Sequence, residues 1–135
     1  MEKQIISILS STKTIAIVGA SSNESKDSFK VMKYLKKNGY KVIPINPNKL
    51  GKKILGEKVY SNLEEVKMHI DLVDVFRPSN EIPDLAEETV RIKAKTLWLQ
   101  LGIFNNEAKK IVESSNINFV ENKCTKNEYK KFFEK

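Results

Sequence analysis

The chain has 135 residues, 40% of them hydrophobic, which suffices for one ordinary core and is too short for a second domain to be expected. Basic residues outnumber acidic ones by 24 to 17, and the net charge of +7 favours anionic partners such as phosphorylated small molecules or nucleic acid. The single cysteine excludes an internal disulfide and a cysteine-based zinc cluster. We expect one domain over residues 1–135, with a core of about residues 12–124, in the cytoplasm and not in a membrane.

Five short apolar runs rich in β-branched residues recur along the chain. They are residues 15–18, 42–45, 72–76, 97–99 and 117–120. The stretches between the first four runs can hold a crossover helix, and the nearly continuous hydrophobicity of the runs suits strands that are covered on both faces. The sequence therefore predicts an α/β fold, a single Rossmann-like doubly wound domain with a five-stranded, mostly parallel sheet.

The first helical signals lie on either side of the first strand. Residues 5–9 are apolar at helical spacing and are interrupted by serine, which is not the profile of a signal peptide. An apolar stripe from Phe29 to Leu35 predicts a helix after the first strand, and Asn38 with Gly39 supplies its end.

Irregular structure is expected around the second strand. Pro44 lies inside this strand and removes a hydrogen-bond donor, so we expect a strand end or an irregularity there. Residues 46–60 form the longest loop expected, and loops of this length are often functional. Ser61 and Glu64 fit a capping box that opens a short helix.

Three further helices are predicted in the second half of the chain. Ser79 can cap the first of them, in which Pro83 predicts a kink or a later start. Asn105 or Asn106 can cap the second. Residues 125–135 form the third, a helical tail whose aromatic side chains have the spacing of one helix face that packs on the sheet.

Ligands of open parallel sheets bind beyond the carboxyl ends of the strands, so the residues that follow each apolar run are the candidates. After the first run, Gly19 permits a tight turn and is followed by small residues that let backbone N–H groups approach a phosphate. These residues are Ala20, Ser21 and Ser22. The dinucleotide fingerprint G-x-G-x-x-G is poorly matched, because Ser21 and Glu24 stand at its second and third glycine positions.

Charged and polar residues continue this candidate phosphate site. Lys26 and Ser28 could add a point charge and a hydroxyl group. The second run is followed by Asn46, Pro47 and, two residues later, Lys49, with no carboxylate for the ribose of NAD. A lysine at this place suits a ribose that bears a phosphate, as in coenzyme A (CoA) or NADP.

The sequence shows no catalytic constellation and no metal-ligand spacing. His69 is the only histidine and precedes the third strand, away from the strand carboxyl ends. Asp74, inside that strand, is interpreted as a hydrogen-bonded structural carboxylate. We therefore expect no catalytic residues and no metal.

Several motifs occur together and in order. They are IVGAS at 17–21, GYKVIPINPN at 39–48, LGE at 55–57, VDVFR at 73–77, WLQLG at 98–102, and Cys124. In this combination the chain resembles the small stand-alone CoA-binding proteins, relatives of the CoA-binding domain in the alpha subunit of succinate–CoA ligase. The resemblance covers nearly everything from Thr14 to Cys124, and it implies that CoA or an acyl-CoA lies across the carboxyl edge of the sheet.

The resemblance also implies roles for individual residues. It places the CoA phosphates at Ala20, Ser21 and Ser22, near Lys26 and Ser28. It matches Asn46, Pro47 and Lys49 to a ligase segment whose lysine contacts the nucleotide. It assigns Phe76, Arg77 and Pro78 to the adenine or diphosphate side. It assigns Gln100 and Gly102 to the wall near the pantetheine arm.

Two departures from the family pattern replace arginine by lysine. The chain has Lys26-Asp27-Ser28 where the family commonly shows Arg-Pro-Ser, and Asn122-Lys123-Cys124 where Asp-Arg-Cys is usual. Lysine keeps the charge but loses bidentate phosphate geometry, so a lower affinity is expected. Cys124 follows the fifth strand and could meet the thiol end of CoA in a mixed disulfide, or be an inert half-buried thiol.

The leading hypothesis is a CoA-binding module without catalysis of its own, because the chain lacks the phosphohistidine domain of the ligases. One alternative is an NADP-linked oxidoreductase with a minimal Rossmann domain, although no proton donor is in place. The other is an adaptor for nucleic acid or a protein partner, which rests on the net charge alone. Neither nucleic-acid binding nor membrane binding is expected on the leading hypothesis, and a homodimer or a protein partner stays open.

Overall fold

A computed structural model describes residues 1–49 and 51–134. Within them, five strands form one sheet in the order β2-β1-β5-β6-β7, and every pairing is parallel. The strands are β1 (Thr14–Val18), β2 (Lys41–Ile45), β5 (Leu72–Val75), β6 (Thr96–Leu99) and β7 (Asn118–Val120). The predicted Rossmann-like α/β fold is confirmed, and each strand lies within one residue of its predicted bounds.

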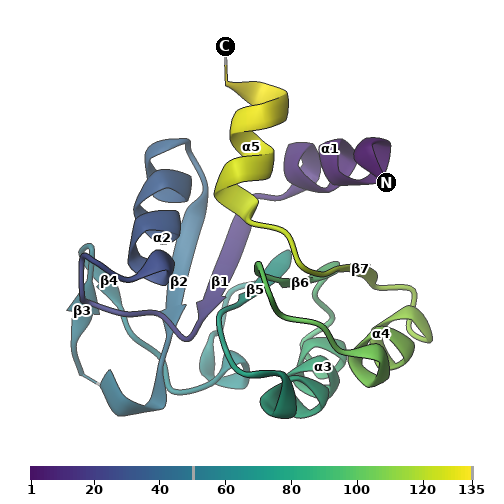
Figure 1. Ribbon diagram of the computed structural model, residues 1–135. Helices are drawn as coiled ribbons and strands as arrows, with labels where there is room; N and C mark the ends of the chain where they lie inside the picture. The colour runs from purple at the N-terminus through teal and green to yellow at the C-terminus, as the bar shows by residue number, and fades with distance from the viewer. Residues whose placement is uncertain (50, 135) are drawn as a thin grey trace.

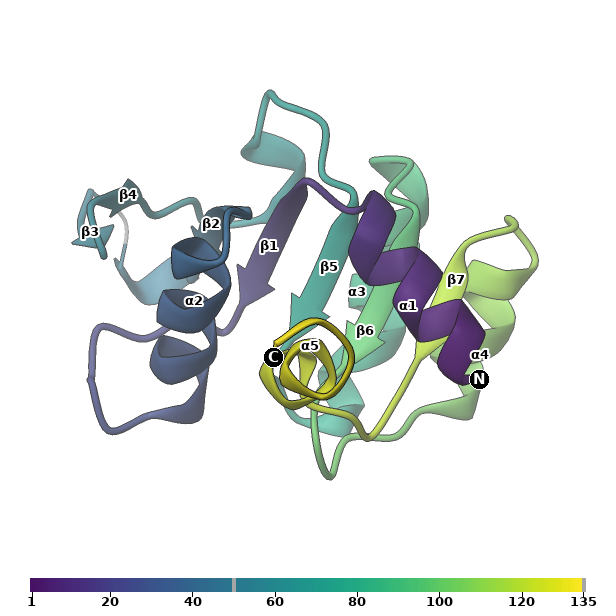
Figure 2. The same cartoon turned by 90° about the horizontal axis from the view of Figure 1, so that it is seen from above.

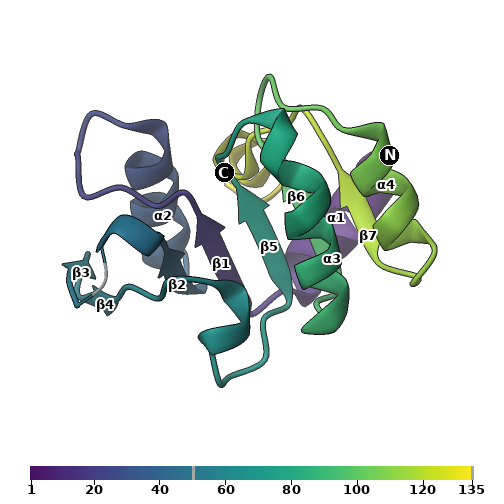
Figure 3. The same cartoon turned by 90° about the horizontal axis from the view of Figure 1, so that it is seen from below.

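Helices cover both faces of the sheet (Figure 1). One face carries α1 (Glu2–Ser11), α2 (Asp27–Lys37) and α5 (Thr125–Phe133), and the other carries α3 (Ile82–Arg91) and α4 (Asn106–Glu113). Figure 2 shows the first face, with α1 and α5 beside α2. Figure 3 shows the opposite face under α3 and α4, with a small hairpin projecting beyond β2. The sheet is therefore doubly wound.

Alternate side chains of each strand enter two separate cores. In β1, Ile15 and Ile17 pack against α1, α2 and α5, whereas Ala16 and Val18 pack against α3 and α4. All four are at most 5% exposed, and burial of an isoleucine side chain contributes about 2 kcal/mol to stability. This two-sided burial is why the strand sequences are continuously hydrophobic.

The strand end or irregularity that was expected at Pro44 is not found. β2 runs through Pro44, which lies opposite Ile17 in the ladder with β1. Since β2 is the edge strand of the described sheet, the missing N–H group of the proline faces away from any ladder partner. The Pro44 carbonyl accepts a hydrogen bond from the Tyr60 N–H at 3.0 Å.

The loop of residues 46–60 is more regular than predicted. It contains a 3₁₀ turn, η1 (Pro47–Lys49), and an antiparallel pair, β3 (Lys53–Ile54) and β4 (Glu57–Lys58). Leu50 lies outside the described residues. Positive φ angles at Leu55 and Gly56 turn the chain between the two short strands, as a tight hairpin requires.

The helix starts were predicted with mixed success. Asn62, not Ser61, caps the short 3₁₀ turn η2 (Leu63–Glu65), because its side chain accepts from the Glu65 N–H at 3.0 Å. Ser61 instead bonds the Glu65 carboxylate through its hydroxyl group. Asn105 does cap α4, accepting from the Ala108 N–H at 2.8 Å.

The prediction that Ser79 caps α3 is wrong. It opens the 3₁₀ turn η3 (Ser79–Glu81), and its hydroxyl group donates to the Phe104 carbonyl. The helix proper starts later, at Ile82, so Pro83 falls in the first turn, where its missing N–H group costs no hydrogen bond. The expected later start is therefore confirmed.

The predicted C-terminal helix is confirmed as α5, while Lys135 of the expected tail lies outside the described residues. Tyr129 of α5 makes edge-to-face contacts with Tyr34 and Tyr40, at centroid distances of 5.9 and 5.8 Å. The helix therefore packs over α2 and the sheet. None of the helices in the described parts of the chain is both long and apolar enough to cross a membrane.

Candidate functional site

The strand order reverses next to β1. The chain leaves β1 for β2 on one side and returns to β5 on the other, so the connections after β1 and β5 run to opposite sides. Such a switch point opens a crevice at the carboxyl edge of the sheet. Gly19 follows β1 and Phe76 follows β5, which puts both predicted segments at this crevice.

Gly19 lets the two segments approach closely. Its φ is +88°, and a Cβ atom added there would lie 2.8 Å from the Phe76 carbonyl oxygen and 3.0 Å from Cδ of Arg77. Its N–H group donates to the Ile45 carbonyl at the end of β2, at 3.0 Å. Both the backbone angle and the lack of space require glycine at this position.

The loop after β1 presents only part of the expected row of phosphate donors. The Ala20 N–H is directed to the Ile45 carbonyl at 3.3 Å. The N–H groups of Ser21 and Ser22 have no protein acceptor within residues 1–49 and 51–134. The helix α2 begins without a side-chain cap, so its first N–H groups also point outward with the positive end of the helix dipole. These groups can bind an anion.

Asn46 holds two of the loops together. Its side-chain amide donates to the Ala20 carbonyl at 2.8 Å, and its side-chain oxygen accepts from the Asn48 N–H at 2.8 Å. Pro47 and Lys49 lie in η1, and the Lys49 side chain is exposed. The predicted segment after β2 is therefore built around a fixed asparagine with an exposed lysine beside it.

A first cleft of about 610 Å³ lies between the ends of β1, β2 and β5, the start of α2 and the side of α3. It brings together most of the predicted phosphate and nucleotide residues. They are Gly19, Ala20, Ser21, Lys26, Ser28, Asn46, Pro47, Phe76 and Arg77. Ser22 and Lys49 are not among its lining residues and lie exposed in the adjoining loops.

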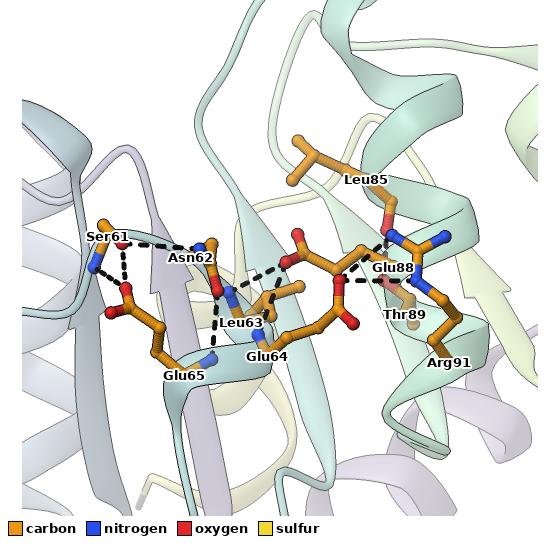
Figure 4. A network of polar contacts seen from close by, with 9 residues as sticks. All are labelled: Ser61, Asn62, Leu63, Glu64, Glu65, Leu85, Glu88, Thr89 and Arg91. Atoms are coloured by element: carbon orange, nitrogen blue, oxygen red, sulfur yellow. Dashed lines mark hydrogen bonds and ion pairs between the residues drawn. The ribbon is translucent and has the colours of Figure 1, made fainter.

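The outer wall of the first cleft comes from Ser61 and Asn62, which directly precede η2, and from α3 (Figure 4). The Glu88 carboxylate accepts from the N–H groups of Leu63 and Glu64, at 3.1 and 3.4 Å, and thereby docks η2 on α3. Burial raises the pKa of Glu88 above its ordinary value. Arg91 pairs with Glu64 at 3.1 Å on the outside of this contact.

A second cleft, of about 520 Å³, lies between α2, the ends of β5 and β6, and the start of α5. Five predicted residues line it, namely Phe76, Arg77, Pro78, Gln100 and Cys124. Gly102 is not among its lining residues, and its N–H group donates to the Asn122 side chain at 2.8 Å. Gly102 therefore shapes the rim, while its neighbour Leu101 lines the cleft.

A buried polar network forms the floor of the second cleft. Asp74 is fully buried and accepts hydrogen bonds from the Gln100 amide and from the Thr125 hydroxyl, the latter at 2.8 Å. Burial raises the pKa of Asp74 to about 7, against the opposing effect of these hydrogen bonds. The interpretation of Asp74 as a hydrogen-bonded structural carboxylate is confirmed, and it fixes the start of α5 next to Cys124, whose own thiol pKa is raised by burial.

The two clefts adjoin each other and share three lining residues. These are Asp27, Phe76 and Arg77. The Arg77 guanidinium forms two bonds to Glu81, from Nε at 3.0 Å and from Nη2 at 2.6 Å. Together the clefts can hold an elongated anionic ligand, with donors for phosphate in the first part and apolar walls in the second.

The sequence reasoning missed residues that only long-range packing brings to the site. Lys30 and Lys126 line the second cleft, and Glu81 and Glu88 line the first. The spacing of four residues between Arg77 and Glu81 was a usable signal for an ion pair. Nothing in the local sequence marks Lys30, Lys126 or Glu88.

Comparisons with known proteins show the family of this chain. A family model described as CoA binding domain matches residues 13–130. The protein YneT of Bacillus subtilis (strain 168) is 36% identical, with 91% of this chain and 90% of that protein covered. An ADP-forming acetate–CoA ligase of Methanocaldococcus jannaschii is 31% identical over 86% of this chain, which spans only 17% of that enzyme.

The fold also matches solved structures. The structure of cell-free ID.343 from Thermus thermophilus superimposes with a TM-score of 0.94 at 33% identity, covering 98% of this chain and 99% of that one. The agreement covers the whole arrangement of helices and strands. On the family match and these relatives, this chain belongs to the CoA binding domain family.

Proposed function

We propose that this protein binds CoA or an acyl-CoA across the carboxyl edge of its sheet and carries or presents it without catalysing a reaction. The observation that carries the proposal is that the two clefts adjoin each other at Asp27, Phe76 and Arg77. A nucleotide diphosphate with a long, less polar arm needs adjoining sites of these two characters. The family match supports CoA as the ligand.

In the proposed orientation, the phosphates lie at the N–H groups of Ser21 and Ser22 and at the start of α2. Lys26 and the Ser28 hydroxyl flank this point, since both line the first cleft. Lys49 reaches the ribose phosphate from outside. A helix start that lacks a side-chain cap offers its N–H groups and its dipole to the same phosphates.

The pantetheine arm then passes Phe76 into the second cleft. Pro78, Gln100 and Leu101 form walls there, and Cys124 also lines this cleft. The amide nitrogen of Gln100 is already bonded to Asp74 and Thr125, so this residue serves as a fixed wall.

Calorimetric titration tests the ligand. We expect CoA to bind, dephospho-CoA to bind more weakly, and NADPH to give no saturable heat. Micromolar binding of NADPH without any heat from CoA would replace the proposal by the oxidoreductase alternative. Native mass spectrometry of the freshly purified protein should show bound CoA or one particular acyl-CoA, which would settle the physiological form.

The non-catalytic role is tested separately. We expect that acetyl-CoA incubated with the protein releases no thiol beyond the rate of a buffer control. Sustained thiol release at more than one equivalent per protein molecule would assign a thioesterase or transferase activity instead.

Cys124 offers a test of the ligand's direction. If the thiol end of CoA reaches this residue, CoA disulfide should exchange with it, so that the Cys124 thiolate forms a mixed disulfide and one CoA thiolate leaves. Because burial raises the pKa of Cys124, the exchange should accelerate as the pH rises. Mass spectrometry should detect the adduct, and Cys124→Ser should abolish it; absence of an adduct in the parent protein would place the thiol elsewhere.

A further inference from the structure

The Arg77 guanidinium stands at the junction of the two clefts, where its Nε–Nη2 edge is already bonded to a carboxylate. Its Nε and Nη2 donate to the two carboxylate oxygens of Glu81, at 3.0 and 2.6 Å. Both side chains are 44% exposed, so the pair faces the open cleft. A phosphate group uses the same two-point geometry on a guanidinium. The Nε–Nη2 edge therefore cannot bond to Glu81 and to a phosphate at once.

The surroundings hold Arg77 in this place. Its Cδ lies 3.0 Å from where a Cβ atom of Gly19 would be, so the side chain is packed against the loop after β1. Glu81 ends η3 and lies one turn further along the chain. Other charged groups line the same cleft, but Glu88 is turned to the N–H groups of η2. Glu81 is thus the carboxylate that engages Arg77 among the described residues.

We infer that Glu81 is a built-in competitor of the ligand's phosphate, displaced from Arg77 when the ligand binds, and that it sets both affinity and selectivity for polyphosphate anions; this rests on the proposed function. In the exchange, the bidentate bond to Glu81 breaks, a bidentate bond to a phosphate forms, and the Glu81 carboxylate is released to water. The two phosphates of a diphosphate carry at least two negative charges between them and therefore gain from the exchange, whereas a ligand that bears a single carboxylate replaces one carboxylate by another.

The test is a double-mutant cycle with two probes, CoA and inorganic pyrophosphate, titrated at one fixed ionic strength. Glu81→Gln should bind both probes about two- to fivefold more tightly, the range expected for loss of a solvent-exposed ion pair. Glu64→Gln is the matched control, because it breaks the comparable Arg91 ion pair outside the lining of the cleft, and it should leave both affinities unchanged. Thermal melting confirms that each variant is folded.

The decisive arm is the Arg77→Met background. There, Glu81→Gln should give no gain, because the fork for which Glu81 competes is gone. A gain that persists would mean general charge repulsion and would overturn the inference, as would equal or weaker binding by Glu81→Gln alone. If neither the parent protein nor any variant binds CoA but the cycle holds for pyrophosphate, the proposed CoA function is wrong, while the competition between Glu81 and phosphate for Arg77 is confirmed. If neither probe binds, both fail.

Discussion

The two clefts meet at one wall but differ in charge. Beyond the shared residues, the first cleft carries Lys26 together with two carboxylates, Glu81 and Glu88, whereas the second carries Lys30 and Lys126. The first must therefore rely on backbone N–H groups and the start of α2 to hold an anion, while the second offers ammonium groups directly. The net charge of +7 does not reveal this division, because surface lysines spread over the fold produce most of it.

The largest expected effect concerns the floor of the second cleft, through Asp74→Asn. Folding raises the pKa of this buried carboxyl from 3.8 to about 7, so the folded state binds a proton that the unfolded state has lost between these values. Its contribution to stability is therefore full below pH about 4 and falls as the pH rises to about 7. The Asp74→Asn variant has no carboxyl to titrate, so it should not lose this stability as the pH rises. The loss in the parent protein amounts to at most on the order of 4 kcal/mol above neutral pH.

Urea unfolding from acid to alkaline pH measures the effect, with Asp84→Asn on the exposed side of α3 as the control. The difference between Asp74→Asn and the parent protein should change with pH, and that of the control should not. A pH-independent difference would mean that folding does not shift the pKa of Asp74, so that the carboxyl is charged at neutral pH. In that case the second cleft has an anionic floor, and the charge comparison between the clefts needs revision.

The next effect separates the geometry of the first cleft from simple backbone strain. Gly19→Ala should lower the free energy of unfolding by about 2 to 3 kcal/mol, because it combines an unfavourable φ of +88° with overlap against the Phe76 carbonyl. Gly39→Ala has a similar φ of +97° but open space, so it should cost only the strain. Chemical denaturation compares the two. Equal losses of unfolding free energy in the two variants would show that the segments after β1 and β5 can move apart to accept a Cβ atom at Gly19.

The shared wall is tested by Arg77→Ala, with Arg91→Ala as the control. Loss of a charged, bidentate phosphate contact should weaken CoA binding by about 10- to 100-fold, whereas the Arg91 variant should bind like the parent. Calorimetry gives both values. If Arg77→Ala weakened dephospho-CoA and CoA by different factors, the guanidinium would contact the ribose phosphate and not the shared diphosphate.

The smallest effect lies outside the first cleft, at Lys49. The Lys49→Ala variant should bind CoA about two- to fivefold more weakly and bind dephospho-CoA as before, since an exposed lysine contributes a screened attraction to the ribose phosphate alone. Lys52→Ala is the control. Raising the salt concentration should remove the difference. An equal loss of affinity for CoA and dephospho-CoA would mean that Lys49 contacts the diphosphate in the first cleft and not the ribose phosphate.

Much of the fold followed from local pattern. The five strands and the helix from Asp27 to Lys37 were predictable because continuous β-branched runs and a 3.6-residue stripe are local signals. Helix starts were less predictable, since Asn62, Ser61 and Ser79 all carry side chains able to cap. Which of them caps depends on the packing of η2 and η3 against the rest of the fold.

The sequence by itself determined the α/β class, the glycine turn after β1 and the segments that follow each strand, because these depend on residue type and spacing along the chain. Only the tertiary structure decided which of them share a cleft. It turned Asn46 and Gln100 into fixed walls and brought Lys30 and Lys126 to the second cleft. Those relations join residues from different elements, and strand order and burial fix them rather than any local pattern.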